Sequence, residues 1–316
     1  LQSSVFSLQS SVFSLLSLVQ HYMQNFTFKN WLLAIRPKTL PAGIAPVLMG
    51  TMMAFGDGIG DAVTALVCLF TALLLQIGTN LANDYYDFKK GADTQERVGP
   101  TRVTQSGLIP PEQVKAAFIG VFALAALASI WLVLRGGWPI GVLASLAILS
   151  GIFYTAGRYP LGYLGLGDLL VFIFFGPVAV AGTYYVQSLE LNAAIIFAGF
   201  APGLMSVAIL TVNNLRDIDS DRKSGKNTLA VRFGRGFALS EYLFCVLGAC
   251  IVPVFIYMFI EDHVLILVSS AISLAAIPTI KTVLTRTEGV ALNTALASTA
   301  RLLLIYSVLF AAGWLL

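Results

Sequence analysis

The chain has 316 residues, of which 57% are hydrophobic and only 11% are charged, and its net charge is +3. Its mean hydropathy is +0.83. A soluble domain carries about 25% charged residues, so this composition excludes a soluble enzyme and indicates an integral membrane protein. The small positive charge comes from the uneven loops described below and does not indicate nucleic-acid binding.

The first 22 residues differ in kind from the rest of the chain. They contain the direct repeat LQSSVFSLQSSVFS and lack the basic segment that opens a secretory signal. We interpret residues 1–22 as a non-native or disordered leader. Residues 23–316 are then expected to form a single intramembrane domain.

Nine apolar runs follow in chain order, each close to the 20 or so residues that a helix needs to cross a membrane. Because backbone groups find no water in lipid, and no run alternates strictly between polar and apolar residues, we predict helices. The runs cover residues 39–56, 62–83, 112–134, 138–157, 166–186, 192–214, 237–259, 263–284 and 292–316. The predicted fold is an all-α bundle of nine transmembrane helices with a central cavity that opens to the cytoplasmic face.

Basic residues are distributed unevenly between the connections of these runs. All 19 Lys and Arg residues, except Arg135 and Arg301, lie before the first run or after an even-numbered run. Connections rich in Lys and Arg remain in the cytoplasm. The amino terminus and the ends of the second and sixth runs are therefore predicted to face the cytoplasm.

A polar cluster, NLANDYYDFKKGAD, covers residues 80–93 at the end of the second run. Asn80, Asp84 and Asp87 are spaced i, i+4 and i+7, so they share one face of a helix. Asn83 lies four residues before Asp87 and adds to that face. The pattern predicts a stripe of side-chain oxygens at the cytoplasmic end of the helix.

A second polar cluster, NNLRDIDSDRKSGKN, covers residues 213–227 at the end of the sixth run. Asn214, Asp217 and Asp221 are spaced i, i+3 and i+7 and again share a face. Carboxylates stacked at a membrane edge repel one another, so a cation is expected between the clusters. Oxygen ligands without nearby His or Cys favour Mg²⁺ over zinc, and Mg²⁺ commonly shares its ligands with phosphate. The predicted metal ligands are Asp84, Asp87, Asp217 and Asp221.

Basic residues lie close to both clusters. Guanidinium and ammonium groups bind phosphate oxygens, so acids that hold Mg²⁺ beside these bases predict a diphosphate site. The predicted diphosphate-binding bases are Arg36, Lys38, Arg97, Arg102, Lys226 and Arg232. A divalent-cation transporter is the alternative from another class. It would need acidic ligands near mid-membrane with access from both faces, whereas these acids gather at one face.

The two clusters resemble the paired aspartate-rich motifs of the UbiA-type intramembrane prenyltransferase superfamily. The resemblance extends from about residue 31 to the end of the chain and implies nine helices. Members bind an isoprenoid diphosphate through Mg²⁺ and ionise it to an allylic cation that attacks an aromatic acceptor. By this resemblance Tyr154, Arg158 and Asp168, from FYTAGRYPLGYLGLGD, face the active-site cavity. Each has a plainer explanation, as a membrane-interface aromatic, a basic loop residue and a charge at a helix start.

Longer strings resemble the branch of this superfamily that prenylates 1,4-dihydroxy-2-naphthoate in menaquinone synthesis. They are RPKTLP, NLANDYYDFKKGAD, RVGPTR, GLGDLLVFIFFGPVAVAGTYY and NNLRDIDSDRKSGKNTLAVRFG. The branch implies polyprenyl transfer with loss of CO₂ and diphosphate, giving demethylmenaquinol, in the inner membrane of a bacterium. Gly91 stands where the wider superfamily often has a further Asp, which leaves the role of Asp93 open. The alternatives within the superfamily are a phytyl donor, or 4-hydroxybenzoate or homogentisate as the acceptor.

Overall fold

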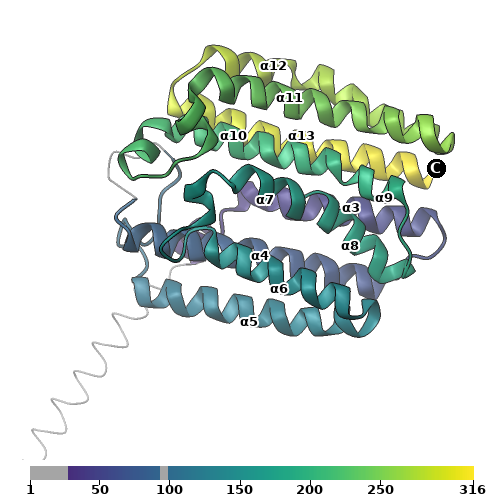
Figure 1. Cartoon of the computed structure of the whole chain (residues 1–316), viewed down its shortest axis with the longest axis horizontal. Coiled ribbons are helices and arrows are strands. Elements are labelled where there is room, and N and C mark those ends of the chain that lie inside the picture. Colours follow the sequence, from purple (N-terminus) through teal and green to yellow (C-terminus); the bar gives the residue numbers. More distant parts are fainter. Residues whose placement is uncertain (1–27, 93–98) are drawn as a thin grey trace, which may run out of the picture.

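The computed structural model describes residues 28–92 and 99–316, so the leader interpretation for residues 1–22 lies outside it. The described residues form a bundle of long helices that run side by side (Figure 1). The helices that follow the amino-terminal α2 (Phe28–Ile35) are α3 (Leu40–Gly56), α4 (Ala62–Lys89), α5 (Pro111–Gly136), α6 (Trp138–Phe153), α7 (Gly167–Phe174), α8 (Pro177–Ser188), α9 (Ala193–Ala198), α10 (Phe200–Lys223), α11 (Leu229–Ile260), α12 (Ile272–Thr285) and α13 (Gly289–Leu315). Three 3₁₀ helices, η1 (Pro37–Thr39), η2 (Leu161–Leu164) and η3 (Val264–Ala271), complete the set.

Eight of the helical segments in the described part are long and apolar enough to cross a membrane. The all-α membrane fold is therefore confirmed. The fourth predicted run, 138–157, is the exception, because α6 has only 16 residues and spans about 24 Å against a hydrocarbon core of about 30 Å. The chain leaves α6 at Tyr154, and Gly157, with a φ of 82°, lies in the turn that follows. Eight candidate spans plus one shorter apolar helix are thus found where nine spans were predicted.

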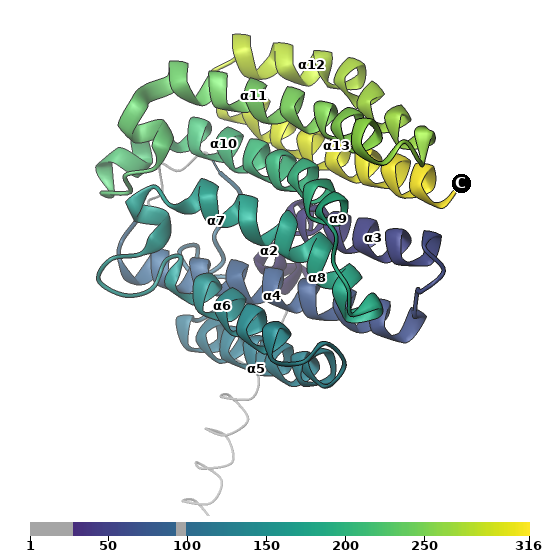
Figure 2. The same ribbon diagram turned by 45° about the vertical axis from the view of Figure 1, so that its right-hand side comes forward.

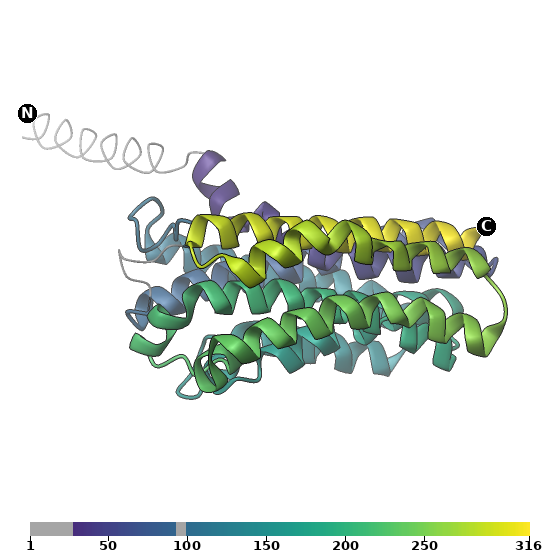
Figure 3. The same ribbon diagram turned by 90° about the horizontal axis from the view of Figure 1, so that it is seen from above.

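The helices fall into two groups with a middle layer. In Figure 1, α4, α5 and α6 lie along one side and α10 to α13 along the other, with α3, α7 and α8 between them; Figure 2 shows the same order after a 45° turn. Along the chain, α4 packs on α5, α10 packs on α11 and α13, and α3 packs on both α8 and α13. Seen from above in Figure 3, the connections after α4, α6 and α10 gather at one end of the bundle.

The fifth predicted run is broken into α7 and α8 at Gly176. Pro177 begins α8, where its missing N–H and fixed φ are tolerated. A β-carbon on Gly176 would clash with the carbonyl oxygen of Phe172 and lie 2.7 Å from that of Gly199. The break therefore depends on a glycine, because the chain here approaches the start of α10 backbone to backbone.

The opposite end of the bundle is tied together by Asp57, directly after α3. Its carboxylate accepts hydrogen bonds from the hydroxyl of Tyr184 on α8 at 2.6 Å and from Nε1 of Trp314 on α13 at 2.9 Å. The oxygen Oε1 of Gln187 on α8 accepts a bond from the backbone N–H of Asp61, the N-cap of α4, at 3.0 Å. Four helices are thus joined at this end.

Candidate active site

A cavity of about 390 Å³ lies inside the bundle, with walls supplied mainly by α3, α4, α6, α7, α8 and α10. One end is polar and receives side chains from both predicted clusters, namely Asn80, Asn83, Asp87, Asn213, Asn214, Asp217 and Asp221. The rest is mostly apolar and reaches as deep as Cys68 on α4. Cys68 and Asp87 are 19 positions apart on one helix, so the cavity extends along about 28 Å of α4.

Asp87 is the most heavily bonded acid of the first cluster. Its Oδ2 accepts a hydrogen bond from Arg102 at 3.1 Å and from Nζ of Lys226 at 2.9 Å, while its Oδ1 accepts one from the hydroxyl of Tyr163 at 2.9 Å. These three partners come from three separate connections, those after α4, α6 and α10. A single buried carboxylate therefore holds three loops over the polar end of the cavity.

Tyr163 was not singled out from the sequence. Two ammonium groups lie over its ring, with Nζ of Lys90 4.8 Å and Nζ of Lys226 5.0 Å from its centroid. Both are cation–π distances. Burial lowers the pKa of Lys90, and Lys226 lowers it further, whereas the carboxylate of Asp87 opposes the shift. The ring of Tyr163 thus contacts two like charges, of which Lys226 also pairs with Asp87.

Asp84 has a different environment from Asp87. It is buried, and its carboxylate accepts hydrogen bonds from the backbone N–H groups of Val103 at 3.2 Å and Thr104 at 3.0 Å. Nη2 of Arg36 lies 3.9 Å away. In this structure Asp84 anchors the loop that carries Arg102 and does not itself line the cavity.

Asp217 on α10 is held by its neighbour Arg216. The guanidinium donates to both carboxylate oxygens, from Nε at 2.8 Å and from Nη2. The same guanidinium also donates to the side-chain oxygens of Asn213 at 2.8 Å and of Asn293 on α13 at 2.6 Å. Arg216 is therefore a second unpredicted residue of the site, and it fixes the orientation of Asp217 from behind.

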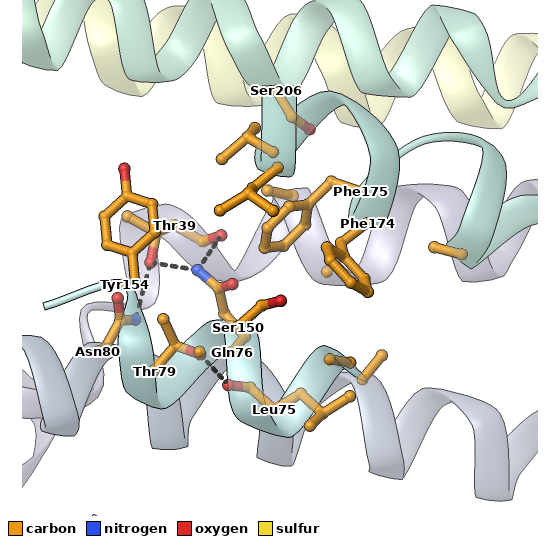
Figure 4. Close-up of a pocket in the computed structure, with 18 of the residues that line it drawn as sticks. Thr39, Leu75, Gln76, Thr79, Asn80, Ser150, Tyr154, Phe174, Phe175 and Ser206 are labelled. Carbon is orange, nitrogen blue, oxygen red and sulfur yellow. Dashed lines mark hydrogen bonds between the residues drawn. The ribbon is translucent and has the colours of Figure 1, made fainter. Parts of the chain in front are cut away.

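The carboxamides of the first cluster are also fixed by hydrogen bonds. Nδ2 of Asn80 donates to the carbonyl oxygen of Ile35 at 2.9 Å and to Oγ1 of Thr39 at 3.1 Å. Oδ1 of Asn83 accepts from Oγ1 of Thr155 at 3.0 Å. Figure 4 shows Asn80, Thr39 and Tyr154 at the same end of the pocket. These bonds connect α4 to the start of α3 and to the end of α6.

The donor set at the polar end fits Mg²⁺. Every group that the two clusters offer is a carboxylate or carboxamide oxygen, the hard donors that this ion takes. Within residues 28–92 and 99–316 no three Asp, Glu, His or Cys side chains form a metal-holding group by themselves. Mg²⁺ at phosphate sites is usually held by one or two carboxylates together with the phosphates. Carboxylates that do not form a complete ligand set by themselves therefore suit an ion shared with a bound diphosphate.

Comparison with known proteins agrees with this geometry. The model of the UbiA prenyltransferase family matches residues 43–298. The chain belongs to the UbiA prenyltransferase family. The resemblance inferred from its motifs is confirmed.

Relatives of this UbiA-family chain include two bacterial proteins. The 1,4-dihydroxy-2-naphthoate octaprenyltransferase of Escherichia coli (strain K12) is 42% identical over 239 residues, covering 74% of this chain and 77% of that protein. The protein of the same name from Mycobacterium tuberculosis (strain ATCC 25618 / H37Rv) is 44% identical over 209 residues, covering 66% and 71%. A UbiA homolog from Archaeoglobus fulgidus, solved with GPP and Mg²⁺, is 16% identical, with a TM-score of 0.63 over 90% of this chain and 99% of that one. The fold is therefore that of the UbiA family.

Some predicted site residues of this UbiA-family chain do not line the cavity. Lys38 and Arg158 are exposed, and Arg158 stacks on Tyr159. Arg232 ties two loops together, because its guanidinium donates to the carbonyl oxygens of Leu164 at 2.8 Å and of Asn227. Arg232 therefore supports the loops after α6 and α10. Arg97 lies outside the described residues.

Tyr154 and Asp168, predicted together, take different positions. Tyr154 lines the cavity and packs closely against two glycines: a β-carbon on Gly162 would lie 2.8 Å from its ring, and one on Gly167 would lie 2.6 Å from its hydroxyl oxygen. Asp168 is buried beside the cavity and does not line it, and its Oδ1 has no hydrogen-bond partner among the described residues. Arg36 and Arg102, two of the predicted diphosphate-binding bases, both line the polar end.

Proposed function

We propose that this chain transfers a polyprenyl group from an isoprenoid diphosphate to 1,4-dihydroxy-2-naphthoate, releasing CO₂ and diphosphate and giving demethylmenaquinol. The observation that carries the proposal is the single cavity that joins oxygen donors and cations at one end to a long apolar interior. The two bacterial relatives, named 1,4-dihydroxy-2-naphthoate octaprenyltransferases, support the choice of acceptor and of a polyprenyl donor over a phytyl donor.

The polar end is proposed to hold the diphosphate. Asp87, Asp217 and Asp221 would hold Mg²⁺, with Asp84 joining them after release from its loop, and Asn80, Asn83 and Asn214 as supporting oxygens. When bound, the ion neutralises negative charge on the diphosphate oxygens. The cations that border this end, Arg36, Arg102 and Lys226, would bind the remaining oxygens. The A. fulgidus homolog, solved with GPP and Mg²⁺, supports this assignment.

The apolar interior is proposed to hold the allylic chain and to exclude water. The bond between the allylic carbon and diphosphate breaks, and its electron pair leaves with the diphosphate. The electron-rich naphthoate ring then attacks the allylic cation; a ring carbon–carbon bond forms and the carboxylate leaves as CO₂, returning its electron pair to the ring. The cation survives only where water is kept out, which the apolar wall accomplishes. Protein groups bind, orient and shield, and no covalent nucleophile is required.

The protein is an integral membrane protein, and we place it in the inner membrane of a bacterium with its amino terminus inside. The site would then open to the cytoplasm, because the basic connections after α4, α6 and α10 lie at its polar end. We assign α6 as the ninth crossing helix, its short length completed by the turn after Phe153.

The test is a reconstituted assay with the purified full chain, Mg²⁺ and a panel of donors and acceptors. We expect transfer from all-trans polyprenyl diphosphates to 1,4-dihydroxy-2-naphthoate, with one CO₂ released per transfer. 4-Hydroxybenzoate, homogentisate and phytyl diphosphate should react poorly. Transfer without CO₂ would contradict the naphthoate acceptor, and Mg²⁺ uptake into proteoliposomes without any transfer would favour a transporter.

The ionisation step has its own test. A fluorine near the allylic carbon destabilises the cation but barely changes the shape of the substrate. A fluorinated prenyl diphosphate should therefore bind as tightly as the normal donor and react far more slowly. Equal rates would indicate direct displacement of the diphosphate.

A further inference from the structure

Gln76 is a buried cavity residue that the proposed reaction has not yet used. Its side chain lines the cavity, and only 8% of the residue is exposed. Its Nε2 donates to Oγ1 of Thr39 at 3.2 Å and lies 3.4 Å from the carbonyl oxygen of the same residue. Its Oε1 has no hydrogen-bond partner among the described residues. Buried polar atoms are nearly always paired, so an unpaired amide oxygen inside a cavity points to a ligand.

The two ends of the Gln76 amide cannot be exchanged. The carbonyl oxygen of Thr39 can only accept a hydrogen bond, so it must face an NH₂ group. Oγ1 of Thr39 donates its own proton to the carbonyl oxygen of Arg36 at 3.0 Å. It is therefore left to accept from Gln76 and from Asn80. If the amide were flipped, Oε1 of Gln76 would face the two oxygens of Thr39 and would repel them. Oε1 is therefore the atom that faces the cavity, as Figure 4 shows.

Gln76 lies at a depth that suits an aromatic ring held beneath the diphosphate. On α4 it precedes Asn80 by one turn, about 6 Å, and Asp87, the acid of this helix that lines the cavity, by about 16 Å. The attacking ring atom must come within about 3–3.5 Å of the allylic carbon, which is itself bonded to the diphosphate. The far edge of such a ring then reaches the level of Gln76. Phe174 and Phe175 line the same cavity and offer aromatic faces for packing (Figure 4).

Resting on the proposed function, we propose that Oε1 of Gln76 accepts a hydrogen bond from a ring hydroxyl of the aromatic acceptor and so selects acceptors that carry this hydroxyl. The hydroxyl becomes more acidic as the ring gives electron density to the allylic cation. The hydrogen bond is therefore stronger in the transition state than in the bound substrate, which favours reaction as well as binding. A site built around such a bond discriminates strongly against an analogue that lacks the hydroxyl.

Ser206 on α10 also lines the cavity with an unpaired hydroxyl among the described residues, and it precedes Asp217 by about 16 Å, as far as Gln76 precedes Asp87 on α4. Thr71 lies too deep for this role, because it is about 7.5 Å farther from the diphosphate end than Gln76 along α4. Thr71 lines the cavity, and its hydroxyl has no hydrogen-bond partner among the described residues. Thr71→Val is thus a matched control, because it removes an unpaired polar atom from the same helix and cavity with little change in volume.

The first experiment compares Gln76→Met with Thr71→Val in the full chain. Gln76→Met should lower kcat/KM for 1,4-dihydroxy-2-naphthoate roughly ten- to hundredfold, the effect of losing one buried hydrogen bond. KM for the prenyl diphosphate should stay within about twofold, which also shows that the variant is folded. Thr71→Val should leave both constants within about twofold. A Gln76→Met variant that matches Thr71→Val would overturn the inference.

The second experiment separates a hydrogen bond to the substrate from the structural link to Thr39. Inhibition constants are measured for 1-hydroxy-2-naphthoate and 4-hydroxy-2-naphthoate, each of which lacks one ring hydroxyl. In the wild type, the analogue without the bonded hydroxyl should bind at least about tenfold more weakly than the other. In Gln76→Met the two analogues should bind alike. If the variant weakens both equally, Gln76 acts only through Thr39 and the proposal is wrong.

Failure of the proposed function gives a different result. If the wild type prenylates 4-hydroxybenzoate and ignores dihydroxynaphthoate, the naphthoate assignment fails. The Gln76 inference is then tested on that acceptor with benzoate as the analogue that lacks the hydroxyl, and the same loss of discrimination in Gln76→Met is expected. Unchanged discrimination on the true acceptor overturns the Gln76 inference alone.

Discussion

Replacing Asp87 by Asn should destabilise the protein as well as stop catalysis, because this carboxylate balances one buried and one half-buried cation. The side chain of Asp87 is 2% exposed, that of Arg102 is 8% and that of Lys226 is 15%. Removing one partner of a buried ion pair costs about 3–5 kcal/mol. We expect the lower figure of about 3 kcal/mol, because the amide oxygen still accepts a hydrogen bond and Lys226 reaches some solvent. At about 2–4 °C per kcal/mol, the unfolding midpoint should fall by about 6–12 °C.

The assay uses the three native cysteines, which are free and buried. A fluorogenic maleimide reports their exposure as the detergent-solubilised protein is heated. The double variant Asp87→Asn/Lys226→Met removes one uncompensated charge. It should therefore recover about half of the decrease in the unfolding midpoint that Asp87→Asn causes, while remaining inactive. Asp219→Asn is the control, since Asp219 is 93% exposed in its pair with Arg222 and should change neither property. An Asp87→Asn variant that unfolds at the wild-type temperature would refute the charge-balance argument.

Four further predictions test the orientation, the metal, the loops and the packing. Cysteines introduced at Lys90 and Asp262 should be labelled from opposite membrane faces; labelling from the same face would overturn the orientation. EDTA should abolish transfer and added Mg²⁺ restore it, so full activity in EDTA would exclude the metal. Tyr163→Phe should lower kcat/KM for the prenyl diphosphate about tenfold, from loss of a hydrogen bond to a carboxylate, while the exposed Tyr159→Phe should not; equal losses would contradict this role. Gly176→Ala should destabilise the protein by about 1–3 kcal/mol in the same thermal assay, and wild-type stability would show that the backbone approach is looser than described.

Hydropathy predicted the helices well because lipid imposes a length and a composition on every crossing segment. The second run begins at Ala62, as α4 does. The breaks within the runs were missed. The fifth run is divided at Gly176 and the sixth at Gly199, and both divisions keep the apolar composition that defined the run. Their cause is backbone contact between segments distant in sequence, which hydropathy does not report.

Spacing also predicted which acids share a helix face, and the cavity lining contains members of both clusters. It did not predict what holds them. Tyr163 reaches Asp87 from a loop 76 residues later, so no local pattern connects the two. Arg216 is adjacent to Asp217, a spacing that places two residues on different helix faces. Only the length and reach of the arginine side chain, which also contacts α13, bring its guanidinium to the neighbouring carboxylate.

The hydrogen bonds around Asp57 and Gln187 determine how the bundle can widen for a large substrate. They fasten α3, α4, α8 and α13 at the end remote from the polar clusters. A helix pivoting there by about 5° moves its other end by roughly 2.6 Å over a 30 Å membrane. The bundle would therefore open at the end that holds the polar clusters while the Asp57 end stays fixed. Amide hydrogens at the Asp57 end should exchange slowly with or without substrate. Those beside Asp87 should become protected only when this end of the bundle closes around a bound diphosphate.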